Sequence, residues 1–154
     1  FNCEYVGADG EKHRPIMIHR VAFGSIERFI GILIEHFAGA FPTWLAPVQV
    51  RVMPVKTDDD SLNTYAKEIC DALKANKVRV DLDDRSEKLG YRMRDGQVQK
   101  VPYLLVIGFN EKDDRTVSFR LHGEKETTVL PLDEFVEKIK AEIAEKSQEH
   151  IHVN

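Results

Sequence analysis

"PYLLVIG", residues 102–108, is an unbroken apolar run that ends at a glycine. A strand that is apolar at every position is typical of a sheet covered by helices on both faces. Further upstream, "VQVRVMPV" (48–55) alternates valines with polar neighbours, which predicts a half-buried strand closed by Pro54. Both runs therefore predict strands of an α/β sheet.

Helical segments separate the predicted strands. Residues 61–75 carry apolar side chains at helical spacing, and Pro131 opens a final helix with Phe135 and Ile139 on its inward face. The order β-α-β-α-β-β-β-α predicts an α/β fold with three parallel strands, right-handed crossovers and a mixed edge. The elements are expected at 48–55, 61–75, 77–83, 87–95, 102–108, 116–121, 127–130 and from 131 onward. The tail at 145–154 is expected to fray.

The composition excludes several classes of protein. The 154 residues are 42% hydrophobic and 31% charged, as in a soluble globular domain, and no apolar run approaches the roughly 18 residues of a membrane span. The net charge of -4 argues against nucleic-acid binding by the whole surface, so such a site has to be a local basic patch. Cys3 and Cys70 are too few for a disulfide framework. Cys70 is expected to be a buried thiol in a reducing, cytoplasmic compartment.

Residues 1–45 and 46–154 form two zones of different character. The first contains the extended "PIMIH" (15–19) and a helix from about Ser25 to Ala38 that is apolar on more than one face. Such a helix is usually buried on several sides, and this zone has too little else to cover it. Together with the missing initiator methionine, this predicts that the chain is excised from a longer protein, with "AFPTWLAP" (40–47) as the connector between zones.

Arg28 lies within that apolar helix without an acidic partner. Helical ion pairs form between residues three or four apart. The positions at those spacings are Gly24, Ser25, Gly31 and Ile32. The guanidinium therefore either faces water or binds an anion from outside the helix.

Three aspartates, Asp81, Asp83 and Asp84, lie at the end of the strand predicted at 77–83. Open α/β sheets bind ligands at the carboxyl ends of strands, where carboxylates suit Mg²⁺ or phosphorylation. A solvated, Asp-capped turn explains the same residues and is the favoured interpretation. A receiver or flavodoxin-like signalling module is disfavoured, because it needs an Asp where the first parallel strand ends in "RVMPVKT" (51–57).

A local excess of positive charge lies between residues 85 and 100. Its five basic residues outnumber Glu87 and Asp95 by three, and they are Arg85, Lys88, Arg92, Arg94 and Lys100. Such a patch offsets phosphate charge, so RNA is a candidate ligand. A solvated helix is the alternative, and the charges alone do not separate the two.

The stretch "HRPIMIHRVAFGSIERFIGILIEHFAGAFPTWLAPVQV" (13–50) resembles the third signature motif of class II aminoacyl-tRNA synthetases, and threonyl-tRNA synthetases in particular. "EKLGYRMRDGQVQKVPYLLVIG" (87–108) is similar to the same family. The resemblance implies that 1–45 is the final strand and helix of a class II catalytic domain. It also implies that 46–154 is an anticodon-binding domain, a three-layer α/β fold with a mixed, mostly parallel five-stranded sheet.

The resemblance assigns roles to three residues of the first zone. The arginine matching Arg28 contacts the ATP triphosphate during catalysis, where a permanently charged fork suits phosphate. Ser25 matches a residue near the adenylate, and His19 matches a ligand of the zinc that recognises threonine. The parent enzyme activates threonine with ATP, Mg²⁺ and zinc, transfers it to tRNA, and is a homodimer. Because the other ligands and motifs precede this sequence, we expect this chain alone to bind no cofactor tightly and not to activate threonine.

In the second zone the resemblance implies contacts with the anticodon of threonine tRNA. The residues matching Glu111 and Arg120 read the second and third anticodon bases, since a carboxylate accepts from guanine N–H groups and arginine donates to uracil carbonyls. A third reader, commonly Asn, is Ser86 here. "GFNEKDDRTVSFR" (108–120) departs from the usual family wording but keeps the Glu-to-Arg spacing. From their charge, three further side chains are expected to hold the tRNA backbone: Lys88, Arg92 and Arg94.

A non-catalytic tRNA-binding or regulatory homologue of the anticodon-binding domain is the alternative hypothesis. The intact "GSIER" (24–28) argues against it. A protein without ATP chemistry has little need of Arg28.

Overall fold

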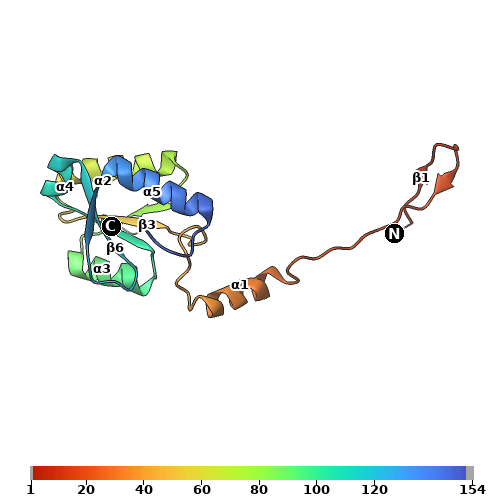
Figure 1. The fold of residues 1–154 in the computed structure, drawn as a ribbon, viewed down its shortest axis with the longest axis horizontal. Helices are drawn as coiled ribbons and strands as arrows, with labels where there is room; N and C mark the ends of the chain where they lie inside the picture. Colours follow the sequence, from red (N-terminus) through yellow and green to blue (C-terminus); the bar gives the residue numbers. More distant parts are fainter. Residues whose placement is uncertain (1, 152–154) are drawn as a thin grey trace. The chain divides into compact units, whose positions relative to one another are not determined.

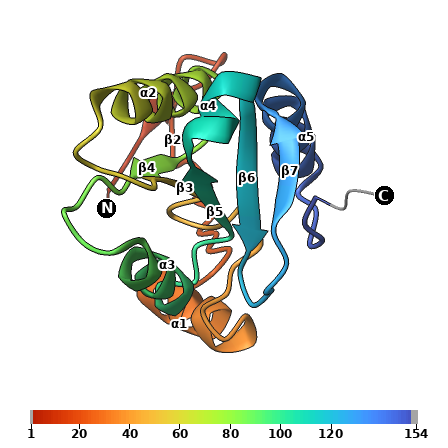
Figure 2. The ribbon, with the colours of Figure 1, turned by 90° about the vertical axis from the view of Figure 1, so that its left-hand side faces the viewer.

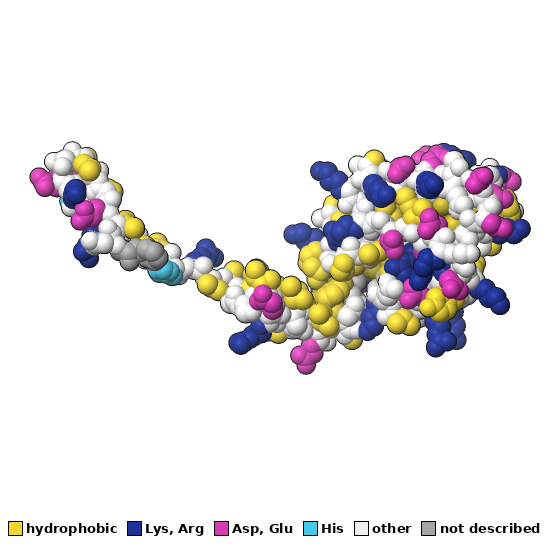
Figure 3. Space-filling model, turned by 180° about the vertical axis from the view of Figure 1, so that it is seen from behind, with side chains coloured by type: hydrophobic (Ala, Val, Ile, Leu, Met, Phe, Trp, Pro, Cys, Tyr) yellow, Lys and Arg dark blue, Asp and Glu magenta, His cyan; other side chains and the backbone are white. Residues whose placement is uncertain are grey.

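The computed structural model describes residues 2–151, which divide into two compact units, Phe1–Leu33 and Ile34–Asn154. The first unit begins with an antiparallel pair, β1 (Tyr5–Val6) and β2 (Lys12–His13). The "PIMIH" segment follows as coil, and helix α1 (Ile26–His36) comes next, two residues shorter at its end than expected. Figure 3 shows hydrophobic side chains exposed along this helix.

A five-stranded sheet forms the centre of the second unit, in the order β4-β3-β5-β6-β7. Strand β3 is parallel to both β4 and β5, whereas β6 and β7 continue the sheet in antiparallel fashion (Figure 2). The strands are β3 (Val50–Pro54), β4 (Val80–Leu82), β5 (Tyr103–Ile107), β6 (Thr116–Leu121) and β7 (Thr128–Pro131). This confirms the expected α/β fold with three parallel strands and a mixed edge.

Helices cover both faces of the sheet and give three layers (Figure 1). Helices α2 (Asp60–Ala75) and α5 (Leu132–Glu145) lie on one face, and α3 (Leu89–Val98) lies on the other. Helix α2 begins at Asp60 because the Asp59 side chain accepts hydrogen bonds from the backbone N–H groups of Ser61 and Leu62. A short helix that the sequence analysis did not predict, α4 (Phe109–Asp114), joins β5 to β6.

The core has two parts because successive strand residues point to opposite faces. Val52 and Leu105 pack toward α2 and α5, whereas Met53 and Leu104 pack toward α3. All five residues of β3 are buried, so the prediction of a half-buried strand is wrong. The strand is central, and Arg51 at a polar position is itself only 6% exposed.

Gly96 allows α3 to pack closely on the sheet. A Cβ at this position would lie 2.6 Å from Leu104 Cδ2. This close approach brings α3 against β5, and the same helix and strand contribute residues to the cavity described below.

The tail does not fray through its described part. Ile151 packs against the core, and its backbone N–H donates to the Tyr103 hydroxyl at 2.8 Å. The tail continues beyond 151 outside the described residues.

Cys70 lies on the inward face of α2 and is 3% exposed, as expected, whereas Cys3 is exposed. Burial raises the pKa of the Cys70 thiol to about 11. Since the thiolate is the reactive form, we expect a thiol reagent at pH 8 to modify Cys3 rapidly and Cys70 only after unfolding. Counting modified thiols by mass spectrometry, with Cys3→Ser as control, checks this; rapid double modification of the native chain would contradict it.

Candidate functional site

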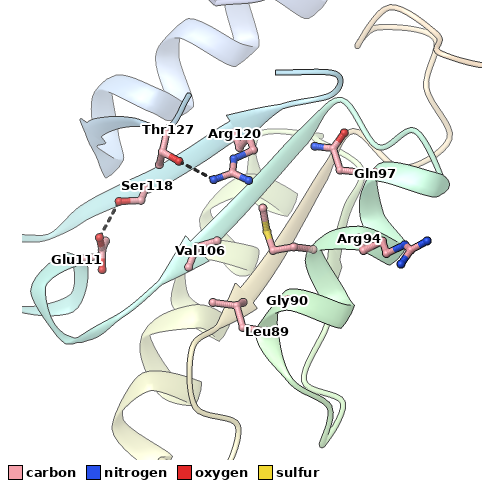
Figure 4. A pocket seen from close by; sticks show the side chains of 10 residues that line it. Leu89, Gly90, Arg94, Gln97, Val106, Glu111, Ser118, Arg120 and Thr127 are labelled. Carbon is pink, nitrogen blue, oxygen red and sulfur yellow. Dashed lines mark hydrogen bonds between the residues drawn. The ribbon is translucent and has the colours of Figure 1, made fainter. Parts of the chain in front are cut away.

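A cavity of about 630 Å³ opens between α3 and the strands β5 and β6. Its lining comes from four places: α3, β5, the start of α4, and β6 with the turn that follows it (Figure 4). The lining residues are Leu89, Gly90, Met93, Arg94, Gln97, Val106, Glu111, Ser118, Arg120 and Thr127. Three expected site residues, Glu111, Arg120 and Arg94, therefore lie around one cavity.

Glu111 supplies hydrogen-bond acceptors on one wall. Its Oε2 accepts from the backbone N–H of Gly108 at 2.9 Å, which caps α4, and its Oε1 accepts from the Ser118 hydroxyl at 2.6 Å. Burial favours the neutral acid, but these bonds and the backbone N–H of Glu111 outweigh it, so the pKa of Glu111 lies below its usual value. The carboxylate is therefore ionised near neutral pH and held in one orientation.

Arg120 supplies donors on the same face of β6 as Ser118, because residues two apart on a strand share a face. Its Nη2 donates to Thr127 Oγ1 at 3.3 Å. Its Nε is buried and has no hydrogen-bond partner among residues 2–151. Since buried polar groups normally find partners, this N–H is one that a water molecule or a ligand acceptor can satisfy.

Helix α3 forms the opposite wall and is fixed to the β6–β7 turn by Gln97. The Gln97 amide donates to the Leu121 carbonyl at 3.3 Å and accepts from the Gly123 N–H at 3.0 Å. Arg94 is exposed and extends away from Glu111 and Ser118 at the cavity rim (Figure 4). The cavity thus combines fixed acceptors and donors with an apolar floor that includes Met93 and Val106.

The expectation that Arg92 holds the tRNA backbone does not fit the structure. Arg92 is 1% exposed, and its guanidinium donates to the carbonyls of Asp83, Pro54 and Glu87. Its position on the helix points it into the protein, so it anchors α3. Its charge alone could not reveal this.

Ser86 and Lys88 precede α3 and are exposed, but neither lines the cavity. Lys88 occupies the N-cap position of α3 without a side-chain capping bond. Both residues are accessible to a large ligand, and their proposed tRNA contacts lie outside the cavity.

Two of the three aspartates in the acidic turn form ion pairs with arginines. Asp83 is buried and pairs with Arg85 at 2.7 Å, which holds the pKa of its carboxyl below the usual value. Asp81 pairs with Arg51 at 2.9 Å. The prediction of a solvated, Asp-capped turn is therefore wrong, because Asp83 is buried and ion-paired and because Lys88, not an aspartate, occupies the N-cap of α3.

The first unit places Ser25 at the start of α1. Its hydroxyl accepts from the Arg28 backbone N–H at 3.4 Å and donates to Glu27 at 2.8 Å. Arg28 itself is exposed and forms no ion pair within residues 2–151. His19 is exposed on coil, and the described residues contain no group of three His, Cys, Asp or Glu side chains placed to hold a metal ion, so those present do not fit a zinc site.

Sequence reasoning missed Ser118, Gln97 and Thr127. Ser118 could have been found, because it stands two residues before Arg120 on a predicted strand and must share its face. Gln97 and Thr127 carry no such signal, since their roles depend on the packing of α3 against the β6–β7 turn.

A family model described as an anticodon binding domain matches residues 49–142, more than half of the chain. This chain belongs to the anticodon-binding domain family. The matched region holds the whole sheet and every residue of the cavity.

Curated relatives extend the similarity beyond this domain. A threonine–tRNA ligase from Caldanaerobacter subterraneus subsp. tengcongensis is 54% identical over 147 residues, which are 96% of this chain and 22% of the relative. A threonine–tRNA ligase from Clostridium tetani is 55% identical over 143 residues, 93% of this chain and 22% of the relative. The chain thus spans 22% of the length of these relatives.

Solved structures show the same fold. The RNA binding domain of threonyl-tRNA synthetase from Cryptosporidium parvum Iowa II matches with a TM-score of 0.71 and 30% identity, over 91% of this chain and 35% of that one. A prolyl-tRNA synthetase from Cryptosporidium parvum, complexed with L-proline and AMP, matches with a TM-score of 0.63 and 26% identity, over 69% of this chain and 22% of that one. Both structures thus share the α/β fold of this chain.

Proposed function

We propose that the α/β domain binds the anticodon of threonine tRNA as the C-terminal part of a threonine–tRNA ligase. The observation that carries this proposal is the cavity lined on one wall by the ionised Glu111 and by Arg120, whose Nε has no hydrogen-bond partner among residues 2–151. Single-stranded RNA is read by side chains that bond the edges of splayed-out bases. A carboxylate suits guanine N–H groups, and a guanidinium suits base carbonyls.

The tRNA backbone runs past the exposed basic side chains at the start and the rim of α3. Lys88 and Arg94 are exposed and stand next to the cavity-lining residues Leu89 and Met93 in the helix. Their charges offset phosphate, whereas Arg92 is excluded by its burial. Ser86 contributes its hydroxyl to the same surface.

Substituting Glu111 tests the base-reading role. We expect Glu111→Gln to weaken binding of a threonine anticodon stem-loop about tenfold, because an amide replaces one acceptor facing the guanine N–H groups by a donor. Changing the second anticodon base should weaken the wild-type chain similarly and have little further effect on Glu111→Gln. Titration by fluorescence anisotropy at fixed salt measures both.

Glu137→Gln is the matched control, since it removes the same charge from an exposed position on α5 across the sheet. It should leave affinity unchanged. Equal affinity of wild type and Glu111→Gln, or equal binding of stem-loops with and without the second base change, would overturn the proposed function.

The parent enzyme, in this proposal, is a cytoplasmic homodimer that activates threonine with ATP and Mg²⁺ and transfers it to tRNA. Arg28 contacts the ATP triphosphate there, Ser25 lies near the adenylate, and His19 is one ligand of the zinc. Relatives more than 50% identical that carry the ligase name support this role. Arg28 is exposed and forms no ion pair among residues 2–151, and its guanidinium suits an anion supplied by the parent. Within the described residues, no helix has the length and hydropathy to cross a bilayer.

A further inference from the structure

Glu111 and Arg120 carry opposite charges, line one cavity and yet do not pair. The described ion pairs include neither residue. Each group is instead held by a neutral hydroxyl: Ser118 donates to Glu111 Oε1 at 2.6 Å, and Thr127 accepts from Arg120 Nη2 at 3.3 Å (Figure 4). The two hydroxyls therefore hold the charged groups toward different partners.

Ser118 has the position required for this role. It is 8% exposed and stands on β6 two residues before Arg120, so the two side chains share a face of the strand. Its hydroxyl donates to Glu111 Oε1 at 2.6 Å, so the carboxylate would have to break this hydrogen bond to turn toward the guanidinium. Without that hydroxyl, an ionised carboxylate and a guanidinium in one partly buried cavity would attract each other strongly.

The hydrogen bonds that hold the Glu111 carboxylate also leave some of its lone pairs free for a ligand. One bond from Ser118 reaches Oε1 and one bond from the Gly108 N–H reaches Oε2. An ionised carboxylate has about four lone-pair sites, so each oxygen keeps room for one further donor. A base edge with two adjacent N–H donors can bond both carboxylate oxygens, whereas a base with a single donor can bond only one of them.

We propose that Ser118 is a positioning residue that keeps Glu111 from pairing with Arg120 and thereby selects a base edge with two N–H donors. This inference rests on the proposed function, because it concerns the same cavity. It goes further in naming the residue that keeps the acceptors and the donors separate.

The test uses the full chain and two anticodon stem-loops that differ only in guanine or inosine at the second base, inosine lacking the N2 amino group. We expect Ser118→Ala to weaken binding of the guanine RNA about fivefold and to remove most of the preference for guanine over inosine. Ser118→Thr keeps the hydroxyl and should restore both. The Arg120 Nε–H signal in NMR should shift in Ser118→Ala as the guanidinium pairs with Glu111.

Ser61→Ala is the matched control, because it removes another hydroxyl bonded to a carboxylate, Asp59 at 2.7 Å, at the start of α2. It should change neither affinity nor base preference. If Ser118→Ala fails to fold, Thr127→Val can be used instead, because it removes the hydroxyl that accepts from Arg120. It should also reduce the preference for guanine.

Three results would decide against the inference. Wild-type affinity and base preference in folded Ser118→Ala, with a clear loss in Glu111→Gln, would overturn the inference and leave the proposed function standing. An unchanged Arg120 Nε–H signal in Ser118→Ala would overturn it as well. No loss in either Ser118→Ala or Glu111→Gln would overturn the proposed function and the inference together.

Discussion

Replacing Arg92 with methionine is expected to lower the free energy of unfolding by about 4 kcal/mol, because two buried carbonyls and one partly buried carbonyl would lose hydrogen bonds from a charged donor. The guanidinium donates to Asp83 O at 2.8 Å, to Pro54 O at 2.8 Å and to Glu87 O at 3.1 Å. Methionine fills much of the same volume but offers no donor. Urea denaturation followed by circular dichroism measures the change.

Arg94→Met is the control for this substitution. Arg94 is exposed on the same helix, so its replacement should change stability by less than about 0.5 kcal/mol. Arg92→Lys should be intermediate, since an ammonium can reach only some of the three carbonyls. A loss of less than about 1 kcal/mol in Arg92→Met would contradict the anchoring role given to this side chain.

Because Arg92 anchors α3, replacing it would affect the cavity as well as the free energy of unfolding. Helix α3 has no side-chain cap at its start, and Arg92 ties that start to the end of β3 and to the 83–87 loop. Helix α3 is one wall of the cavity. Loosening it would therefore change the distance between that wall and Glu111 or Arg120, in addition to lowering stability.

The strands and the long helices could be predicted from the sequence, because their apolar side chains recur at the spacing that places them in the core. Residues 116–121 are a strand in both the prediction and the structure. The short α4 was missed because "FNEKDD" has a single apolar residue and therefore no periodicity. Strand β3 was expected to be half-buried, since no local pattern reveals that Arg51 is covered by the pairing partners Asp81 and Gln99.

The candidate site was predicted in part. Glu111 and Arg120 followed from the family resemblance, and the structure places both at one cavity. Arg92 and Arg94 are two residues apart and equally charged, yet one is buried and the other exposed. Only the helix position relative to the sheet distinguishes them, and that position depends on the Gly96 contact with Leu104.

Replacing Tyr103 with phenylalanine is expected to lower the free energy of unfolding by about 2 kcal/mol, because the buried Glu142 carboxylate and the partly buried Ile151 N–H would each lose a hydrogen bond. The Tyr103 hydroxyl donates to the carboxylate of Glu142, which is 7% exposed, and accepts from the Ile151 N–H at 2.8 Å. Hydrogen exchange of the Ile151 amide should accelerate by roughly thirtyfold if the tail detaches with that free energy. Tyr91→Phe, at a residue 57% exposed, should change neither quantity.

The pH dependence distinguishes this buried phenol from a simple packing residue. Burial, followed by the Glu142 charge, raises the pKa of Tyr103 far above its usual value. A group whose pKa is raised by folding stabilises the native state fully below the unfolded pKa, which is about 10 for tyrosine, and loses that contribution as the pH rises.

The stability difference between wild type and Tyr103→Phe should therefore be constant from pH 6 to 9 and shrink by about 1.4 kcal/mol per unit above pH 10. Tyr65, which is present in both proteins, cancels from the comparison. A difference that stays constant to pH 11 would mean that the phenol is not held as a proton donor to Glu142. The attachment of the tail would then depend on the packing of Ile151 and on His150, whose Nδ1 lies 3.2 Å from Thr43 Oγ1 and 3.4 Å from Glu142 Oε1.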